Sequence, residues 1–108
     1  MYKITEEGQS LIITIEDSTY PDNCAELKSC YNEALSRKSE KVLLDISAVN
    51  VIYSSGITEL VQFFTQLKSS NRKLVLVGAQ EGVFKIFKLL GLHQLFAFAS
   101  NLEEAKNI

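Results

Sequence analysis

The sequence has little of what marks membrane-spanning, secreted or nucleic-acid-binding proteins. No apolar run approaches the roughly 20 residues of a membrane span, and the first residues, MYKITEEGQ, have no signal-peptide character. The net charge of −2 provides no basic surface for nucleic acid or an anionic membrane. We therefore expect a small domain of 108 residues that binds neither nucleic acid nor membrane.

Cysteine and histidine are also scarce, which limits redox, metal and catalytic chemistry. The two cysteines, Cys24 and Cys30, are six residues apart in one predicted helix and about 240° apart around its axis, so they cannot face each other. The absence of a CxxC pair or a disulfide framework favours a reducing cytoplasm. His93 is the only histidine, and no second ligand type stands at metal spacing beside it. We predict no metal, no cofactor and no catalytic residue, so we do not expect an enzyme.

What the sequence does contain is an alternation of strand and helix patterns around one apolar core. With 46% hydrophobic residues, the chain fits a single domain over residues 1–108. Strands are predicted over residues 2–5, 10–15, 41–46, 73–77 and 95–98. Helices are predicted over residues 23–37, 56–68 and 81–90, and a final helical turn is predicted with Ser100 as its cap. Residues 17–22 are predicted to form a loop. Crossover helices of about ten residues between strands give a largely parallel sheet.

Two serines stand directly before the second predicted helix. Ser54 and Ser55 therefore lie at a helix N-terminus, where backbone N–H groups are free and the macrodipole favours negative charge. A hydroxyl in this place either caps the helix or carries a phosphate. With a helix that begins at Gly56 or Ile57, Ser55 is the predicted cap and Ser54 projects from the loop. Gly56 leaves the backbone open to a partner, and Ser55→Ala is predicted to cost more stability than Ser54→Ala.

Three other features have two interpretations each. Asp45 ends a predicted strand and is either a catalytic carboxylate or, as we favour, an acceptor for N–H groups of its own loop. Residues 78–82 join a strand to a helix but lack the Lys-Ser/Thr of a P-loop, so we interpret them as a turn. Tyr20, Tyr53 and Phe84 are either ordinary half-buried aromatics or a docking face near the two serines.

Three segments, LDISAVNVIYSSGITEL, KLVLVGAQEGVFKIFKLLGL and LFAFASNLEEA, closely resemble the STAS domain. The similarity is to its stand-alone bacterial form, the anti-sigma factor antagonists. It covers about residues 10–105 and is strongest over 45–56 and over 89–96, LLGLHQLF. The resemblance implies an α/β, STAS-like fold over the single domain, with four or five mostly parallel strands, helices packed mainly on one face, and no catalytic site.

The resemblance also implies regulation of transcription by partner switching. The unphosphorylated antagonist binds an anti-sigma factor that is also a serine kinase, ATP-dependent phosphorylation at the start of the second helix breaks the complex, and a phosphatase resets the switch. The matching position here is Ser54, with Ser55 the less favoured alternative. The resemblance and the small, uncharged side chains of this segment give the expected partner contacts: Tyr20, Asp22, Tyr53, Ser54, Ser55, Gly56, Ile57 and Thr58.

The sequence departs from the family pattern at the residue before the expected phosphorylation site. Tyr53 stands where the family usually has aspartate, and a second acidic position falls near Tyr20, with Asp22 as a substitute. Two functions therefore stay open: a phosphorylation switch at Ser54, or a domain that docks constitutively in a transport or signalling assembly with both serines structural. In either case we expect a cytoplasmic bacterial monomer or weak dimer.

Overall fold

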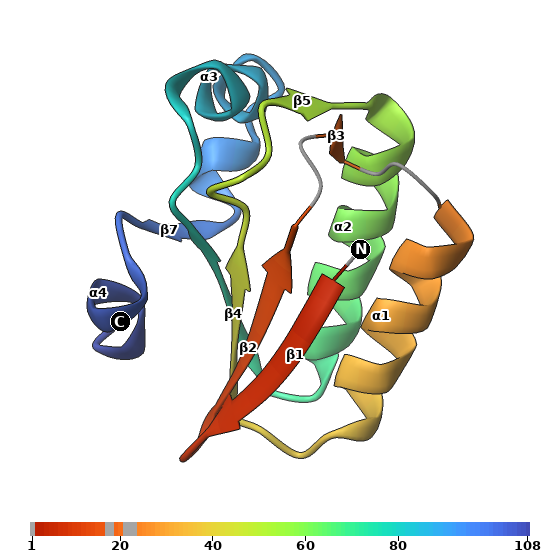
Figure 1. The fold of residues 1–108 in the computed structure, drawn as a ribbon, viewed down its shortest axis with the longest axis vertical. Coiled ribbons are helices and arrows are strands. Elements are labelled where there is room, and N and C mark those ends of the chain that lie inside the picture. The colour runs from red at the N-terminus through yellow and green to blue at the C-terminus, as the bar shows by residue number, and fades with distance from the viewer. Residues whose placement is uncertain (1, 17–18, 21–23) are drawn as a thin grey trace.

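The computed structural model describes residues 2–16, 19–20 and 24–108, and its central element is a five-stranded sheet. The strands are β1 (Tyr2–Glu7), β2 (Ser10–Ile15), β4 (Lys41–Asp45), β6 (Lys73–Val77) and β7 (Ala97–Ala99). They lie side by side in the order β1-β2-β4-β6-β7, with β1 antiparallel to β2 and the other three pairings parallel (Figure 1). The predicted α/β fold with a mostly parallel sheet is confirmed.

Helices cover the two faces of this sheet unequally. They are α1 (Cys24–Ser36), α2 (Ser54–Ser69), α3 (Glu81–Leu89) and α4 (Leu102–Lys106), with a short 3₁₀ turn η1 (Leu92–Gln94). α1 and α2 lie side by side along one face, whereas α4 lies on the opposite side of the sheet (Figure 1). α3 adds Val83 and Phe87 to the core beneath α1 and α2. The prediction that helices pack mainly on one face is therefore confirmed.

The sheet has a hydrophobic core on each face, and β4 contributes side chains to both of them. Alternate side chains of a strand point to opposite faces of the sheet. Val42 and Leu44 accordingly belong to the core under α1 and α2, and Leu43 belongs to the smaller core under α4. All three are fully buried, which explains the unbroken apolar run of this segment.

α2 is fixed on the sheet by a stripe of buried side chains. Leu60, Phe63 and Leu67 follow helical spacing and are 1%, 1% and 0% exposed. The ring of Tyr31 in α1 stacks on Phe63 with centroids 4.1 Å apart. Since these contacts lie in the middle and end of α2, they hold the helix in place while Ser54 and Ser55 in its first turn stay exposed.

A second, two-stranded sheet corrects the loop predicted over residues 17–22. β3 (Thr19–Tyr20) pairs in parallel with β5 (Val51–Ile52), and Tyr20 is the register partner of Ile52. Two residues are too few to show a strand period, so the sequence pattern gave no signal for this pairing. The pairing places the backbone before α1 beside the segment that leads into α2.

The chain between α3 and β7 forms a tight turn that shortens the last strand. Gly91 has a φ of 75° and ends α3 as predicted, because glycine adopts the left-handed conformation without steric cost. The N–H groups of Leu95 and Phe96 both donate to the Leu92 carbonyl oxygen, at 3.0 and 3.1 Å. These two residues therefore belong to the turn, and β7 begins at Ala97 rather than at residue 95.

The predicted cap of the last helix, Ser100, is wrong by one residue. Asn101 is the N-cap, and its side-chain oxygen accepts a hydrogen bond from the Glu104 N–H at 2.8 Å. The Glu104 carboxylate in turn accepts one from the Ser100 N–H at 3.4 Å. Asparagine caps helices as well as serine does, so the pattern alone does not choose between these adjacent positions.

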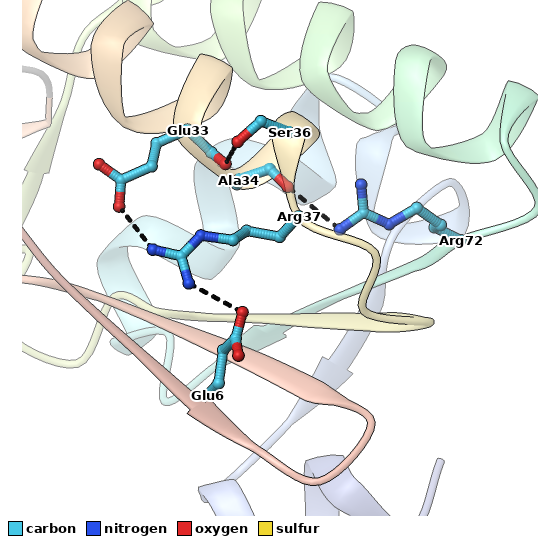
Figure 2. Close-up of polar contacts among 6 residues, drawn as sticks. All are labelled: Glu6, Glu33, Ala34, Ser36, Arg37 and Arg72. Carbon is cyan, nitrogen blue, oxygen red and sulfur yellow. Dashed lines mark hydrogen bonds and ion pairs between the residues drawn. The ribbon is translucent and has the colours of Figure 1, made fainter.

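Arg72, which follows α2, caps the C-terminal end of α1. Its guanidinium donates to the carbonyl oxygens of Ser39 at 2.6 Å, Ala34 at 3.2 Å and Leu35 at 3.5 Å, and Figure 2 shows the bond to Ala34. Carbonyl groups in the last turn of a helix have no partner within the helix, and the last turn of α1 contains no basic residue of its own. Burial lowers the pKa of Arg72, but an arginine still stays charged in a protein. This side chain therefore ties α1 to the start of β6.

Replacing Arg72 is expected to loosen α1. Arg72→Ala should lower the free energy of unfolding by about 1.5–3 kcal/mol, because hydrogen bonds from a charged donor are lost and carbonyl groups are left unpaired. Arg72→Lys should recover only part of this loss, since an ammonium lacks the planar fork of donors. Urea unfolding followed by circular dichroism measures both.

Arg37→Ala is the matched control. Among the described residues, Arg37 makes exposed ion pairs with Glu6 at 2.8 Å and Glu33 at 3.2 Å (Figure 2), and exposed pairs contribute little. A loss for Arg37→Ala as large as that for Arg72→Ala would contradict the capping role of Arg72.

Candidate functional site

The segment that leads from β4 to α2 is held by the neighbouring loop after β6. Asp45 accepts a hydrogen bond from the Ser47 N–H at 3.0 Å, which confirms that it orders its own loop. The Gln80 side chain donates to the Ser47 carbonyl oxygen at 3.0 Å. Gly78 has a φ of 71°, and a Cβ there would lie 2.9 Å from the Cβ of Ser47. Glycine is therefore required where the two loops meet, and the path toward α2 is rigidly set.

α2 begins two residues earlier than the sequence predicts. Tyr53 is the N-cap, with extended backbone angles, and its carbonyl oxygen accepts the N–H groups of Gly56 at 3.0 Å and Ile57 at 3.1 Å. Ser54 and Ser55 are the first two helical residues, and the side chain of the N-cap residue, Tyr53, makes no capping bond. The prediction that Ser55 is the cap is wrong, because the helix already includes it. The predicted larger stability loss for Ser55→Ala is withdrawn with it.

Both serines are exposed at this helix end. The Thr58 hydroxyl donates to the Ser54 backbone carbonyl oxygen at 3.1 Å, so this bond does not involve the Ser54 hydroxyl. Beside them, the side chains of Val51 and Tyr53 are 44% and 53% exposed. We call Val51, Tyr53, Ser54, Ser55 and Thr58 the α2 N-terminal surface. It combines the hydroxyl groups of Tyr53, Ser54, Ser55 and Thr58 with the exposed apolar groups of Val51 and the Tyr53 ring.

The electrostatics of this surface favour an anion. The first turn of α2 contains no acidic residue, so no carboxylate of that turn offsets the positive end of the helix dipole. The backbone N–H groups of Ser54 and Ser55 precede the first hydrogen bonds within the helix, which Gly56 and Ile57 make to Tyr53, so they have no acceptor in α2 itself. Ile57, which is half-buried beneath the surface, adds apolar contact area without charge. A phosphate on Ser54 would therefore meet favourable dipoles and no acidic side chain from the first turn of α2 itself.

Several expected contact residues lie elsewhere or are not described. Gly56 is buried, which removes it from the surface that a partner can reach. Tyr20 is placed by its backbone in β3 opposite Ile52, and Asp22 lies outside the described residues. Val51 was missed by the sequence analysis. Val51 and buried Ile52 are both apolar and β5 has only two residues, so the sequence alone does not indicate which side chain faces outward.

Phe84 packs away from this surface. Its ring meets the ring of Phe98 edge to face, with centroids 5.0 Å apart, between α3 and β7. Of the two interpretations of this aromatic, the structure supports the half-buried packing residue.

The described residues contain neither a cluster of metal ligands nor a membrane-spanning helix. Within residues 2–16, 19–20 and 24–108, no three histidine, cysteine or acidic side chains lie close enough together to hold a metal ion. In the same part of the chain, no helix has both the length and the apolar character needed to cross a bilayer. The absence of enzymatic activity stays a prediction.

The family model of the STAS domain matches residues 2–105. A match of this extent shows that the chain belongs to the STAS domain family, as the resemblance of its three segments implies.

Solved structures share the fold at low sequence identity. An anti-sigma factor antagonist from Mycobacterium paratuberculosis superposes with a TM-score of 0.87 at 15% identity, over 99% of this chain and 91% of the other. For an anti-sigma-factor antagonist (STAS) domain protein from Planctomyces limnophilus the TM-score is 0.85 at 19% identity, over 96% and 93%. The Bacillus cell fate determinant SpoIIAA in its phosphorylated form gives 0.74 at 14% identity, over 99% and 97%.

The capping geometry predicts an unusual ranking of variants. Tyr53→Asp should raise the free energy of unfolding by about 0.5–2 kcal/mol, because aspartate is a preferred N-cap and Tyr53 makes no capping bond. Ser54→Ala and Ser55→Ala should each stay within about 0.5 kcal/mol of wild type. Urea unfolding provides the comparison, with Tyr53→Phe as a control that adds no cap. A loss above about 1 kcal/mol for Ser55→Ala alone would restore Ser55 as the cap.

Proposed function

We propose that this protein is an anti-sigma factor antagonist that works by partner switching. Its α2 N-terminal surface binds an anti-sigma factor serine kinase, phosphorylation of Ser54 releases the complex, and a phosphatase restores the binding form. The protein acts in the bacterial cytoplasm as a monomer or weak dimer. The observation that carries the proposal is the exposed Ser54 hydroxyl in the first turn of α2, beside the exposed side chains of Val51 and Tyr53.

The helix end tolerates the proposed modification. A phosphoserine adds about −1.5 to −2 charge and three strong acceptor oxygens. At the first turn of α2 these oxygens face free N–H groups and the positive end of the dipole, so the fold is preserved. SpoIIAA supports this by analogy, because the fold of this chain resembles both its unphosphorylated form, with a TM-score of 0.79, and its phosphorylated form, with 0.74.

The effect of the phosphate falls on binding. A partner that covers Val51 and Tyr53 also covers Ser54, and has to remove water from the side chain at that position. A hydroxyl loses little hydration in such an interface, whereas a dianion loses a great deal. The same group that is favourable at a free helix end is therefore unfavourable in the complex.

Ser54 is a better acceptor site than Ser55 because it adjoins Tyr53. Successive residues of a helix are about 100° apart around the axis, so the two exposed hydroxyl groups point in different directions. Ser54 is also the position that matches the phosphorylated serine of the resembled family. Ser55→Asp is therefore a matched control for Ser54→Asp, because it places the same negative charge one residue further along α2.

The alternative function is constitutive docking within a transport or signalling assembly. The exposure of Tyr53, at 53%, favours it, because a large aromatic in place of an acidic side chain suits a permanent interface. In that case both serines serve only as the first two residues of α2.

The proposal predicts that charge at Ser54 separates stability from binding. Ser54→Asp should leave the melting temperature nearly unchanged and weaken binding of the cognate anti-sigma factor kinase by about tenfold or more. Calorimetric titration measures the affinity. Ser54→Ala, which is uncharged, should bind like wild type, and Ser55→Asp should weaken binding less.

The kinase reaction gives an independent readout. Incubation with ATP and the cognate kinase should add one phosphoryl group to wild type and none to Ser54→Ala, as measured by intact mass. If Ser54→Asp binds as well as wild type and no phosphoryl group is added, constitutive docking is the better account.

A further inference from the structure

A second group of exposed apolar side chains lies far along the chain from the α2 N-terminal surface. Leu89, Leu90 and Leu95 are 86%, 56% and 42% exposed, at the end of α3 and just before β7. Single exposed leucines are common, whereas an exposed apolar side chain that continues into an apolar groove indicates a contact site, and Leu95 is in this position. Neither the core nor the proposed switch accounts for them.

Leu95 borders an open groove between the second half of α2 and the start of β7. The groove has a volume of about 340 Å³, and its apolar lining comes from Phe64, Leu74, Leu95 and Ala97. The Phe64 ring is held edge to face against Phe96, with centroids 5.0 Å apart. The apolar floor is thus already ordered. We call this feature the Leu95 groove.

The Leu95 groove is positively charged although the whole chain has a net charge of −2. Lys68, Arg72 and Lys73 line it, and no acidic residue does. The Lys68 ammonium lies over the Phe64 ring, 5.9 Å from its centroid. In the described part of the chain, neither Lys68 nor Lys73 takes part in an ion pair. The charges on this rim are therefore available to an acidic partner.

The groove is separate from the proposed switch. Fourteen residues of α2 separate Ser54 from Lys68, which corresponds to roughly 21 Å along the helix axis. Lys68 also lies in the last turn of α2, at the negative end of its dipole, whereas Ser54 lies at the positive end. A partner at one end need not cover the other.

We propose that the Leu95 groove binds an acidic amphipathic segment of a protein partner. Apolar side chains of the segment pack on Phe64 and Leu95, and its carboxylates face Lys68 and Lys73. The apolar floor favours a peptide over a nucleic acid, whose backbone would leave Phe64 and Leu95 without apolar contacts. This proposal does not rest on phosphorylation of Ser54.

Two synthetic helical peptides provide the probe. Both present leucine at positions i, i+3, i+4 and i+7; one has glutamate on the flanking positions and the other has lysine. In amide NMR titrations of the whole protein, the glutamate peptide should shift the signals of Phe64, Lys68, Leu95 and Ala97. It should bind more tightly than the lysine peptide, and more weakly as salt is added.

Substitutions in the groove test which of its residues contribute to the affinity for the glutamate peptide. Lys68→Glu should weaken binding of the glutamate peptide about five- to tenfold, since an attraction becomes a repulsion. Leu95→Ser should weaken it without a change of fold, because Leu95 is exposed in the free protein. Lys3→Glu is the matched control, as Lys3 is exposed on β1 at the opposite edge of the sheet and should bind like wild type.

Three results would overturn the proposal: equal binding of the two peptides, shifts confined to residues 51–58, or no loss of affinity in Lys68→Glu. Concentration-dependent shifts of Leu95 and Ala97 without peptide would also overturn it, because they would show that a second copy of this chain fills the groove.

Discussion

Burial of β4 on both faces is the constraint on which the rest of the molecule depends. Val42 and Leu44 hold α1 and α2 on one side, and Leu43 holds α4 on the other, so the strand has no freedom of register or tilt. A one-residue slip would exchange the two cores. Because β4 is fixed, the loop that leaves it at Asp45 starts from a fixed point. The first turn of α2 is delivered to the surface from that point, through contacts with the loop after β6.

The division between core and helix end explains why the proposed switch at Ser54 is expected to change binding without changing stability. The fully buried large side chains of α2 begin at Leu60, more than one turn beyond Ser54, and before them only Ile57 packs partly on the core. A change at Ser54 therefore acts on hydration and charge at the surface, while packing energies stay as they are. The Leu95 groove lies at the other end of α2. There too, exposed apolar and charged groups lie side by side, so a change in them is expected to affect binding more than packing.

The sequence predicts those parts of the structure that repeat a pattern over many residues. The five strands, the three longer helices and the position of Gly91 all follow from period and from backbone chemistry. The features it missed depend on single residues: the β3–β5 pairing, the start of α2 at Ser54, and Asn101 as the cap of α4. At the candidate site, exposure of Ser54 was predictable, whereas the burial of Gly56 and the exposure of Val51 depend on tertiary contacts.

The central claim is that a phosphate on Ser54 changes the surface and leaves the fold intact. The most direct test is the amide NMR spectrum of the ¹⁵N-labelled protein before and after phosphorylation by the cognate kinase. Our account predicts shifts confined to residues 51–58, with the signals of β4 and β6 unchanged. Shifts that spread through β4 and β6, or a phosphate found on another residue, would contradict it.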